Sequence, residues 1–221
     1  MVLPLEDESR SPSRLPIVTI TIIALNALVF VFELIGGDQF VITWSAIPAQ
    51  IVAGHRLETL LTSMFMHASW SHIIGNMIFL WAFGPEIEDA MNPRRFAVFY
   101  LMGGVVSMLS QIAFDPHSTI PNLGASGAIA AVMGAFLVTY PTDRIRTVLF
   151  FGIFYRIALM PAALLIGLWF LSQLLELGVV AQVQTGGVAY LAHIGGMIFG
   201  AVAGRLFEVS PAQRGETGAY F

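Results

Sequence analysis

Residues 123–136 read LGASGAIAAVMGAF, a stretch in which every residue except one serine is apolar or small. Ser126, Ala130 and Gly134 recur at every fourth position, so on a helix they share one face. Small residues on one face of a membrane helix allow a second helix backbone to approach closely. The stretch therefore predicts a tightly packed membrane helix, and it places a hydroxyl group at the start of that helix.

The composition of the whole chain agrees with a membrane protein. Of the 221 residues, 57% are hydrophobic and 11% are charged, and the mean hydropathy is +0.79. Soluble domains carry about 25% charged residues. We therefore expect an all-α polytopic membrane protein. The chain has no cysteine, which excludes disulfides and thiol chemistry, and no basic run indicates a nucleic-acid partner.

Six runs are apolar and long enough to cross the bilayer as helices, which takes about 20 residues. These runs are residues 15–35, 69–90, 95–114, 124–141, 159–177 and 188–207. We predict a six-helix transmembrane bundle that forms a single domain over residues 1–221. Its six-span core covers residues 15–207, with cytoplasmic tails at 1–14 and 208–221. The sequence does not indicate an oligomeric state.

The arginines predict the orientation of the bundle, because positively charged loops stay in the cytoplasm. All ten basic residues are arginine, and eight of them fall on one side of the membrane if the six spans alternate. These eight are Arg10, Arg14, Arg94, Arg95, Arg144, Arg146, Arg205 and Arg214. We therefore expect both termini in the cytoplasm, and the ends of the helices that carry Ser126 and His193 at the outer side.

Two connecting segments, residues 36–68 and 147–158, are too apolar for ordinary solvated loops. We expect both to lie partly in the membrane interface as short amphipathic helices. The first loop would then be partly embedded in the membrane. An apolar linker without such helices remains an alternative for each segment.

The sixth predicted span has a small-residue face of its own. Its members lie at spacings of three, four and four: His193, Gly196, Gly200 and Gly204. We expect this face to pack against the face that carries Ala130 and Gly134. Ser126 and His193 would then lie at similar depth, and polar residues within a membrane are costly and tend to be functional. Small-residue repeats alone indicate packing only, so a structural interpretation also stays open.

A serine becomes a nucleophile when a nearby base takes its proton, and His193 is the candidate base. No carboxylate lies near either residue on these faces, so the pair would act as a dyad. The developing oxyanion needs hydrogen-bond donors. The backbone N–H of Ser126 is one candidate, and His72 and Asn76, four residues apart on one helix face, are two more. An alternative is that His72 and Asn76 only bridge helices.

Other chemistries fit the residues less well. A zinc site could use histidines, but the HExxH motif is absent and no cysteine is present, so we predict no metal. The nucleophile elbow GxSxG of soluble hydrolases is incomplete because Ala128 occupies its second glycine position. A transporter would show internal repeats and interrupted helix pairs, and neither is convincing here.

Three motifs, in this order, resemble those of the rhomboid intramembrane serine proteases. They are HASWSHIIGN at residues 67–76, GASG at 124–127 and AHIGG at 192–196, the last continuing to Gly200. The resemblance implies a prokaryotic-type, six-span protease of the inner membrane. Such a protease cleaves a peptide bond in or near the transmembrane segment of its membrane-protein substrates, and it uses no cofactor. The family's inactive relatives provide the alternative of a non-catalytic adaptor or quality-control protein.

The resemblance also implies roles for particular residues. Ser126 would be the nucleophile and His193 its base. His72 and Asn76 would donate to the oxyanion, and Gly124 would let the preceding strand pass the site. Some family members carry a tyrosine that stacks on the catalytic histidine, and Ala130 occupies that position here. The orientation of His193 is therefore left to contacts that the sequence does not identify.

Four further features follow from the same resemblance. Glu88 would be a structural carboxylate in the second span, and Arg56 would be a family-type arginine in the first loop. The fifth span would act as a mobile gate, and residues 178–187 would form a cap over the site.

Overall fold

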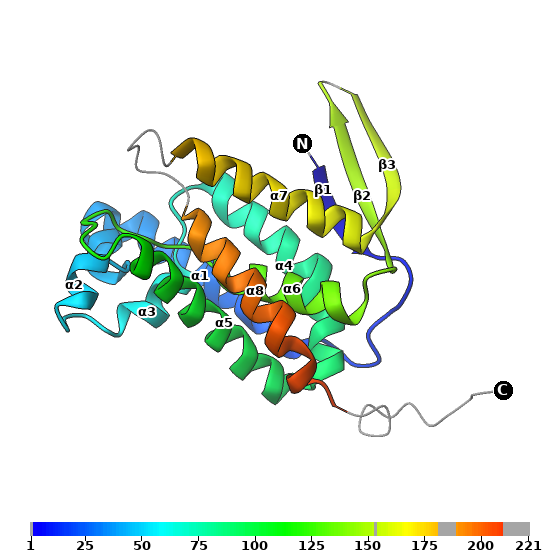
Figure 1. Ribbon diagram of the computed structural model, residues 1–221, viewed down its shortest axis with the longest axis horizontal. Helices are drawn as coiled ribbons and strands as arrows, with labels where there is room; N and C mark the ends of the chain where they lie inside the picture. The colour runs from blue at the N-terminus through cyan, green and yellow to red at the C-terminus, as the bar shows by residue number, and fades with distance from the viewer. Residues whose placement is uncertain (1, 153, 181–188, 210–221) are drawn as a thin grey trace.

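The computed structural model describes residues 2–152, 154–180 and 189–209, and most of these residues are helical (Figure 1). Each of the six predicted spans contains a helix: α1 (Ile17–Trp44), α4 (Trp70–Met91), α5 (Pro93–Phe114), α6 (Ser126–Thr139), α7 (Ala162–Val180) and α8 (Tyr190–Phe207). By length and composition, α1, α5 and α8 could each cross a membrane. Helix α6 and the part of α7 from Ala162 to Leu175 are apolar but shorter. The prediction of a helical membrane bundle is confirmed, whereas the count of six spans stays a prediction. The predicted cap at 178–187 and the tail beyond residue 209 lie largely outside the described residues.

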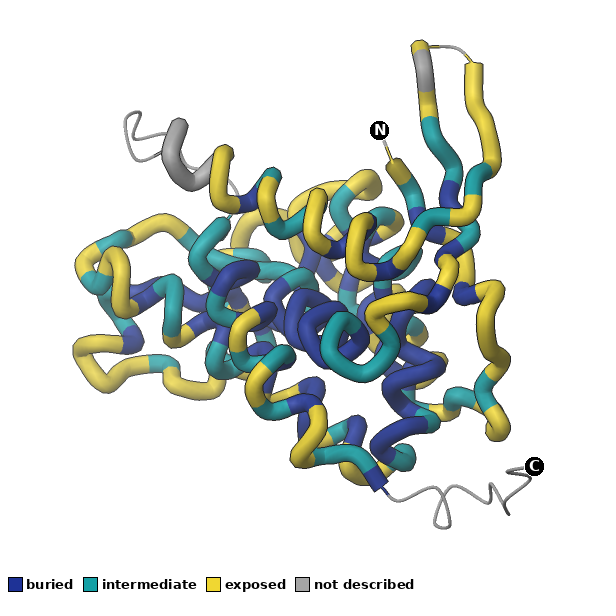
Figure 2. Tube along the Cα trace, turned by 45° about the vertical axis from the view of Figure 1, so that its right-hand side comes forward, coloured by how far each residue is buried: buried dark blue, intermediate teal, exposed yellow. Residues whose placement is uncertain are grey.

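Helix α6 is the buried centre of the bundle. Its residues from Gly127 to Phe136 are all buried, and Figure 2 shows the buried residues gathered in the middle of the molecule. The outer helices instead expose large apolar side chains, such as Leu28 of α1 and Leu168 of α7. A surface of this kind suits a lipid environment, because lipid tails are as apolar as leucine.

The small-residue faces of α6 and α8 meet as the sequence predicts. A Cβ atom at three of their glycines would overlap a backbone carbonyl oxygen of the opposite helix: Gly196 with Gly127, Gly200 with Ala131, and Gly134 with Met197. A Cβ at Gly196 would also lie 3.4 Å from the Cβ of Ala130. The two backbones therefore touch, and the residues at the N-terminal ends of both helices are held beside one another.

The first loop contains the short helices that its apolar residues predict. Helix α1 continues to Trp44 beyond Gly37, which interrupts it with a φ of +57°. Then follow α2 (Pro48–Val52), α3 (Thr59–Thr62) and the 3-10 helix η1 (Ser63–Phe65). Ala46 forms an antiparallel bridge with Asn122, so this loop is fastened to the segment that leads into α6.

The second apolar connection forms a β-hairpin, and the prediction of amphipathic helices over residues 147–158 is wrong. The hairpin comprises β2 (Arg144–Phe151) and β3 (Phe154–Pro161), and α7 begins only after it, at Ala162. β-Branched and aromatic side chains favour strands, and Gly152 supplies a positive φ of +66° for the turn. The base of the hairpin lies beside α7, and its far end extends beyond the helices in Figure 1.

The N-terminal segment, which we predicted as a polar tail, provides the third strand of this sheet. β1 (Val2–Asp7) pairs antiparallel with β2, so the strand order is β1-β2-β3. β1 also lies beside α4. A strand at this position was not expected, because its partner lies more than a hundred residues away in the sequence.

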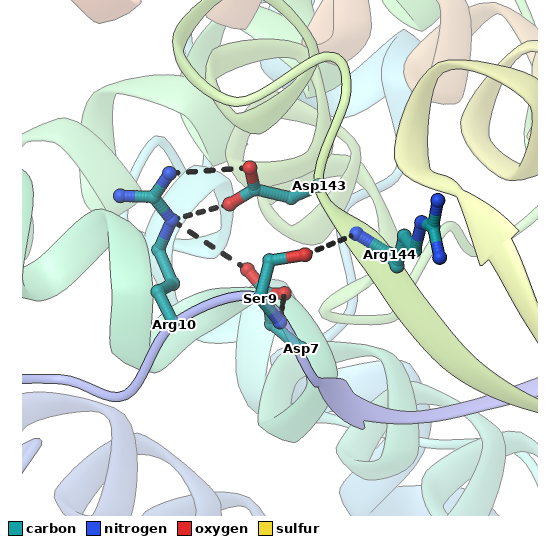
Figure 3. A network of polar contacts seen from close by, with 5 residues as sticks. All are labelled: Asp7, Ser9, Arg10, Asp143 and Arg144. Carbon is teal, nitrogen blue, oxygen red and sulfur yellow. Dashed lines mark hydrogen bonds and ion pairs between the residues drawn. The ribbon is translucent and has the colours of Figure 1, made fainter.

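A network of polar contacts holds this segment to the connection after α6 (Figure 3). The guanidinium of Arg10 pairs with the Asp143 carboxylate and lies 3.6 Å from the centre of the Tyr140 ring. The backbone N–H of Arg144 donates to Ser9 Oγ at 2.7 Å. Burial raises the pKa of the Asp7 carboxyl group to about 6, although it accepts a hydrogen bond from the Ser9 N–H and lies 3.7 Å from Arg10 Nε.

Glu88 fastens the start of α1 to α4. Its carboxylate accepts hydrogen bonds from the backbone N–H groups of Val18 and Thr19 at 2.9 and 2.8 Å, and from Thr19 Oγ1 at 2.8 Å. The first N–H groups of a helix have no partner within the helix, and a negative charge there is favourable. This geometry gives a structural reason for the carboxylate that the family resemblance implied.

Candidate active site

Ser126 is the first residue of α6, and the backbone before it takes a conformation that favours glycine. Gly124 has a φ of +133°, and its N–H donates to the carbonyl oxygen of Ser63 at 2.9 Å. A Cβ at Gly124 would come within 3.0 Å of the His72 ring. The glycine thus allows the chain to pass close to His72 and then turn into α6.

His193 lies in the first turn of α8, and its imidazole faces the hydroxyl of Ser126. His193 Nε2 is 2.6 Å from Ser126 Oγ, across 67 residues of sequence. His193 is buried and Ser126 is partly exposed. The contact between α6 and α8 produces this pairing, because it brings the N-terminal ends of both helices together.

The opposite side of the His193 ring contacts α7, and none of the sequence motifs indicates this contact. His193 Nδ1 is 2.6 Å from Gln173 Oε1, and Gln173 is buried. The Trp169 and Tyr190 rings lie 5.6 and 6.5 Å from the imidazole, measured between ring centres. These contacts hold the ring in a chain that has Ala130 in place of a stacking tyrosine. The sequence does contain a signal for Gln173, because an amide side chain within an apolar span is unusual. No motif includes this residue, however.

Two side chains of α4 at the same cavity as Ser126 carry hydrogen-bond donors. His72 Nδ1 accepts a hydrogen bond from the Ala68 N–H at 3.4 Å, so in the neutral ring the proton lies on Nε2. Asn76 is buried, and its Nδ2 has no hydrogen-bond partner among the described residues. Both donors are thus available to a ligand, which is unusual for a buried amide.

A cavity of about 280 Å³ joins these groups. Helices α4, α6, α7 and α8 all contribute to its wall, which is formed by Ser71, His72, Gly75, Asn76, Phe79, Ser126, Ile129, Met133, Trp169, Gln173, Tyr190 and His193. Ser126, His72, Asn76 and His193 therefore all line one space. Apolar side chains form much of the remaining wall.

His67, the first histidine of the motif at 67–76, lies behind this wall. Burial lowers the pKa of its imidazole to about 3, with a smaller contribution from the neighbouring His72 imidazole. Its ring centre is 5.0 Å from that of His72, and its backbone N–H donates to the Glu33 carboxylate at 3.0 and 2.9 Å. Within the described part of the chain, no group of three or more His, Asp or Glu residues could hold a metal ion.

These features define a class of protein: a helical membrane bundle with a Ser–His pair at the adjoining ends of two closely packed helices. A family model of the Rhomboid domain matches residues 54–208, and the chain belongs to the rhomboid family. The resemblance stated from the three motifs is confirmed.

Several relatives are similar to most of this chain. It is 28% identical over 153 residues to rhomboid protease GluP of Bacillus subtilis (65% of this chain, 30% of the relative). It is 29% identical over 205 residues to RHOMBOID-like protein 12, mitochondrial, of Arabidopsis thaliana (84% and 57%). It is 30% identical over 194 residues to presenilin-associated rhomboid-like protein, mitochondrial, of Mus musculus (81% and 45%). The chain spans between 30% and 57% of the length of these relatives.

Proposed function

We propose that this chain is an intramembrane serine endopeptidase. It hydrolyses a peptide bond in or near the transmembrane segment of membrane-protein substrates, with Ser126 as nucleophile and His193 as base. The observation that carries the proposal is the distance of 2.6 Å between Ser126 Oγ and His193 Nε2 at the wall of a cavity. The similarity to a relative named as a rhomboid protease supports it.

The reaction would begin with attack of Ser126 Oγ on the carbonyl carbon, while His193 Nε2 takes the hydroxyl proton. The negative charge that develops on the carbonyl oxygen is stabilised by the N–H of Ser126 and by His72 and Asn76. The C–N bond then breaks as His193 returns its proton to the leaving amine. Water next attacks the acyl ester with His193 again as base, and this step releases the carboxylic acid and restores the serine.

The substrate is a transmembrane protein within the lipid bilayer. Its scissile carbonyl must leave the hydrogen bonding of a helix before Ser126 can reach it, so helix-weakening residues near the bond favour cleavage. We further propose a multi-pass protein of a prokaryotic inner membrane, with both termini in the cytoplasm and the site facing outward. The excess of arginine on one side of the six helices supports this orientation.

The test uses purified protein in liposomes with a model single-span substrate that carries glycine and proline in the outer half of its span. Ser126→Ala and His193→Ala should each abolish cleavage, because the nucleophile or its base is lost. Ser110→Ala in α5 and His117→Ala in an exposed loop are the matched controls and should cleave as the wild type does. Mass spectrometry of the products locates the bond that is cut.

Unchanged cleavage in either dyad variant would contradict the proposal. Labelling of Ser126 by a fluorophosphonate separates an enzyme from a non-catalytic adaptor, because this reagent needs an activated hydroxyl. A wild-type protein that neither cleaves nor becomes labelled would favour the adaptor.

A further inference from the structure

We infer that Gln173 of α7 is a positioning residue that selects the reactive tautomer of His193, and that the base is therefore competent only while α7 is in place. This inference rests on the proposed function of Ser126 and His193. Its evidence is a continuous series of hydrogen bonds in which each donor can be assigned.

The series begins at a backbone carbonyl, which only accepts. Ser172 Oγ donates to the carbonyl oxygen of Trp169 at 2.7 Å, so the hydroxyl proton is already used in a hydrogen bond. The oxygen of Ser172 can then accept from Gln173 Nε2, which lies 3.1 Å away. With its nitrogen directed to Ser172, the amide of Gln173 presents Oε1 to His193.

An amide oxygen has no proton to give, so His193 Nδ1 must be the donor across the 2.6 Å contact. In a neutral imidazole the other nitrogen, Nε2, is then unprotonated. Nε2 can therefore accept the proton of Ser126 Oγ, which lies 2.6 Å from it. A general base needs this tautomer, and the opposite one would present an N–H to the serine.

Every link before His193 belongs to α7, whereas the two dyad residues belong to α8 and α6. Among the described residues, Gln173 is the hydrogen-bond partner of Nδ1 and Ser126 is that of Nε2. Helix α7 also exposes the apolar side chains of Leu168 and Leu171 on its outer side. A displacement of α7 that breaks the contact with Gln173 would leave His193 without the acceptor that fixes its proton.

The test compares three variants of the full chain in liposomes. Gln173→Met keeps the size of the side chain but removes the acceptor, and Gln173→Glu keeps the acceptor. Leu171→Met, on the exposed side of the same helix, is the matched control. We measure the rate of fluorophosphonate labelling of Ser126, kcat and KM for the model substrate, and the thermal unfolding midpoint.

We expect Gln173→Met to lower the labelling rate and kcat by about 10²-fold, within the range that general base catalysis contributes, with KM and the unfolding midpoint nearly unchanged. Gln173→Glu and Leu171→Met should stay within about threefold of the wild type, because the acceptor is present in both. A Gln173→Met variant that is labelled at the wild-type rate overturns the inference. Equal losses in Gln173→Met and Gln173→Glu with normal unfolding also overturn it.

The ¹⁵N spectrum of His193 in the wild type, assigned by comparison with His193→Ala, provides a measurement that needs no stable Gln173 variant. We expect a protonated Nδ1 and an unprotonated Nε2, and the reverse pattern overturns the inference. Failure of the proposed function is distinguishable, because it would remove labelling and cleavage from the wild type itself.

Discussion

Asn76 and His72 present hydrogen-bond donors to the cavity from one face of α4. The Nδ2 group of Asn76 is buried and has no partner in the described chain, and the geometry of His72 leaves its Nε2 proton free. A buried donor without a partner costs free energy in the resting protein. In the proposed reaction that cost would be recovered when a charged oxygen arrives, so these donors would bind the transition state more strongly than the substrate.

Replacing Asn76 by alanine or by aspartate should therefore lower kcat by about 10²–10³-fold, with a smaller effect on KM. Asn76→Asp is the sharper variant, because it keeps the shape of the side chain but replaces the donor with an acceptor. Steady-state cleavage of the model substrate measures both constants. Near-normal kcat in Asn76→Asp would exclude Asn76 as an oxyanion donor.

At the scale of elements, the site depends on how closely α6 and α8 approach. Gly200 faces the backbone of Ala131, and a methyl group at Gly200 would overlap that carbonyl oxygen. Neither helix can relieve this overlap by rotating a side chain, so the helices must separate. Because Ser126 and His193 lie at the ends of these helices, separation of the helices would also change the distance between these two side chains.

Gly200→Ala should therefore lower the free energy of unfolding by about 1–3 kcal/mol, the usual cost of overpacking, and should reduce cleavage as well. Gly167→Ala in α7 is the control, because among the described residues no atom of another element or of a nearby side chain lies within 4 Å of the position that its Cβ would take. Thermal unfolding in detergent micelles and cleavage in liposomes measure the two effects. Equal behaviour of the two variants would contradict the role of the α6–α8 contact.

The same elements show what could be predicted from sequence. Helices and their packed faces were predictable because apolar length and four-residue spacing are local properties. The motifs also pointed to Ser126, His193, His72 and Asn76, which the structure brings to one cavity. Gln173 was missed, because an amide in a neighbouring helix belongs to no spacing pattern. The hairpin at 144–161 was missed because its apolar residues suit an interfacial helix equally well, and strand β1, with which it pairs, is remote in sequence.

At the scale of the whole molecule, the polar network at Asp7 joins the N-terminal segment to the far end of α6. The folded protein raises the pKa of Asp7 from 3.8 to about 6, mainly through burial. The folded state therefore binds this proton more tightly than the unfolded state does. The contribution of Asp7 to stability is greatest below about pH 4 and falls as the pH rises through 6.

Asp7→Asn should remove this dependence, because asparagine is neutral throughout. We expect the unfolding midpoint of the wild type to fall more between pH 5 and pH 7.5 than that of Asp7→Asn. Asp115→Asn, at an exposed position of the loop after α5, should show the same change in midpoint between the two pH values as the wild type. The midpoints of the three proteins at both pH values provide the comparison, and parallel curves for wild type and Asp7→Asn would refute the expectation.

The pairing of β1 with β2 also means that β1 is made long before its partner strand during biosynthesis. β1 is translated about 140 residues before β2, which at roughly 5–20 residues per second amounts to about 7–30 s. During this interval α1, α4, α5 and α6 leave the ribosome, while the edges of β1 have no strand to bind. Two acidic residues, Glu6 and Asp7, end this strand, and a third, Glu8, follows it. Charge on an unpaired strand opposes association with other chains, so we expect these residues to disfavour association of the nascent chain until the hairpin emerges.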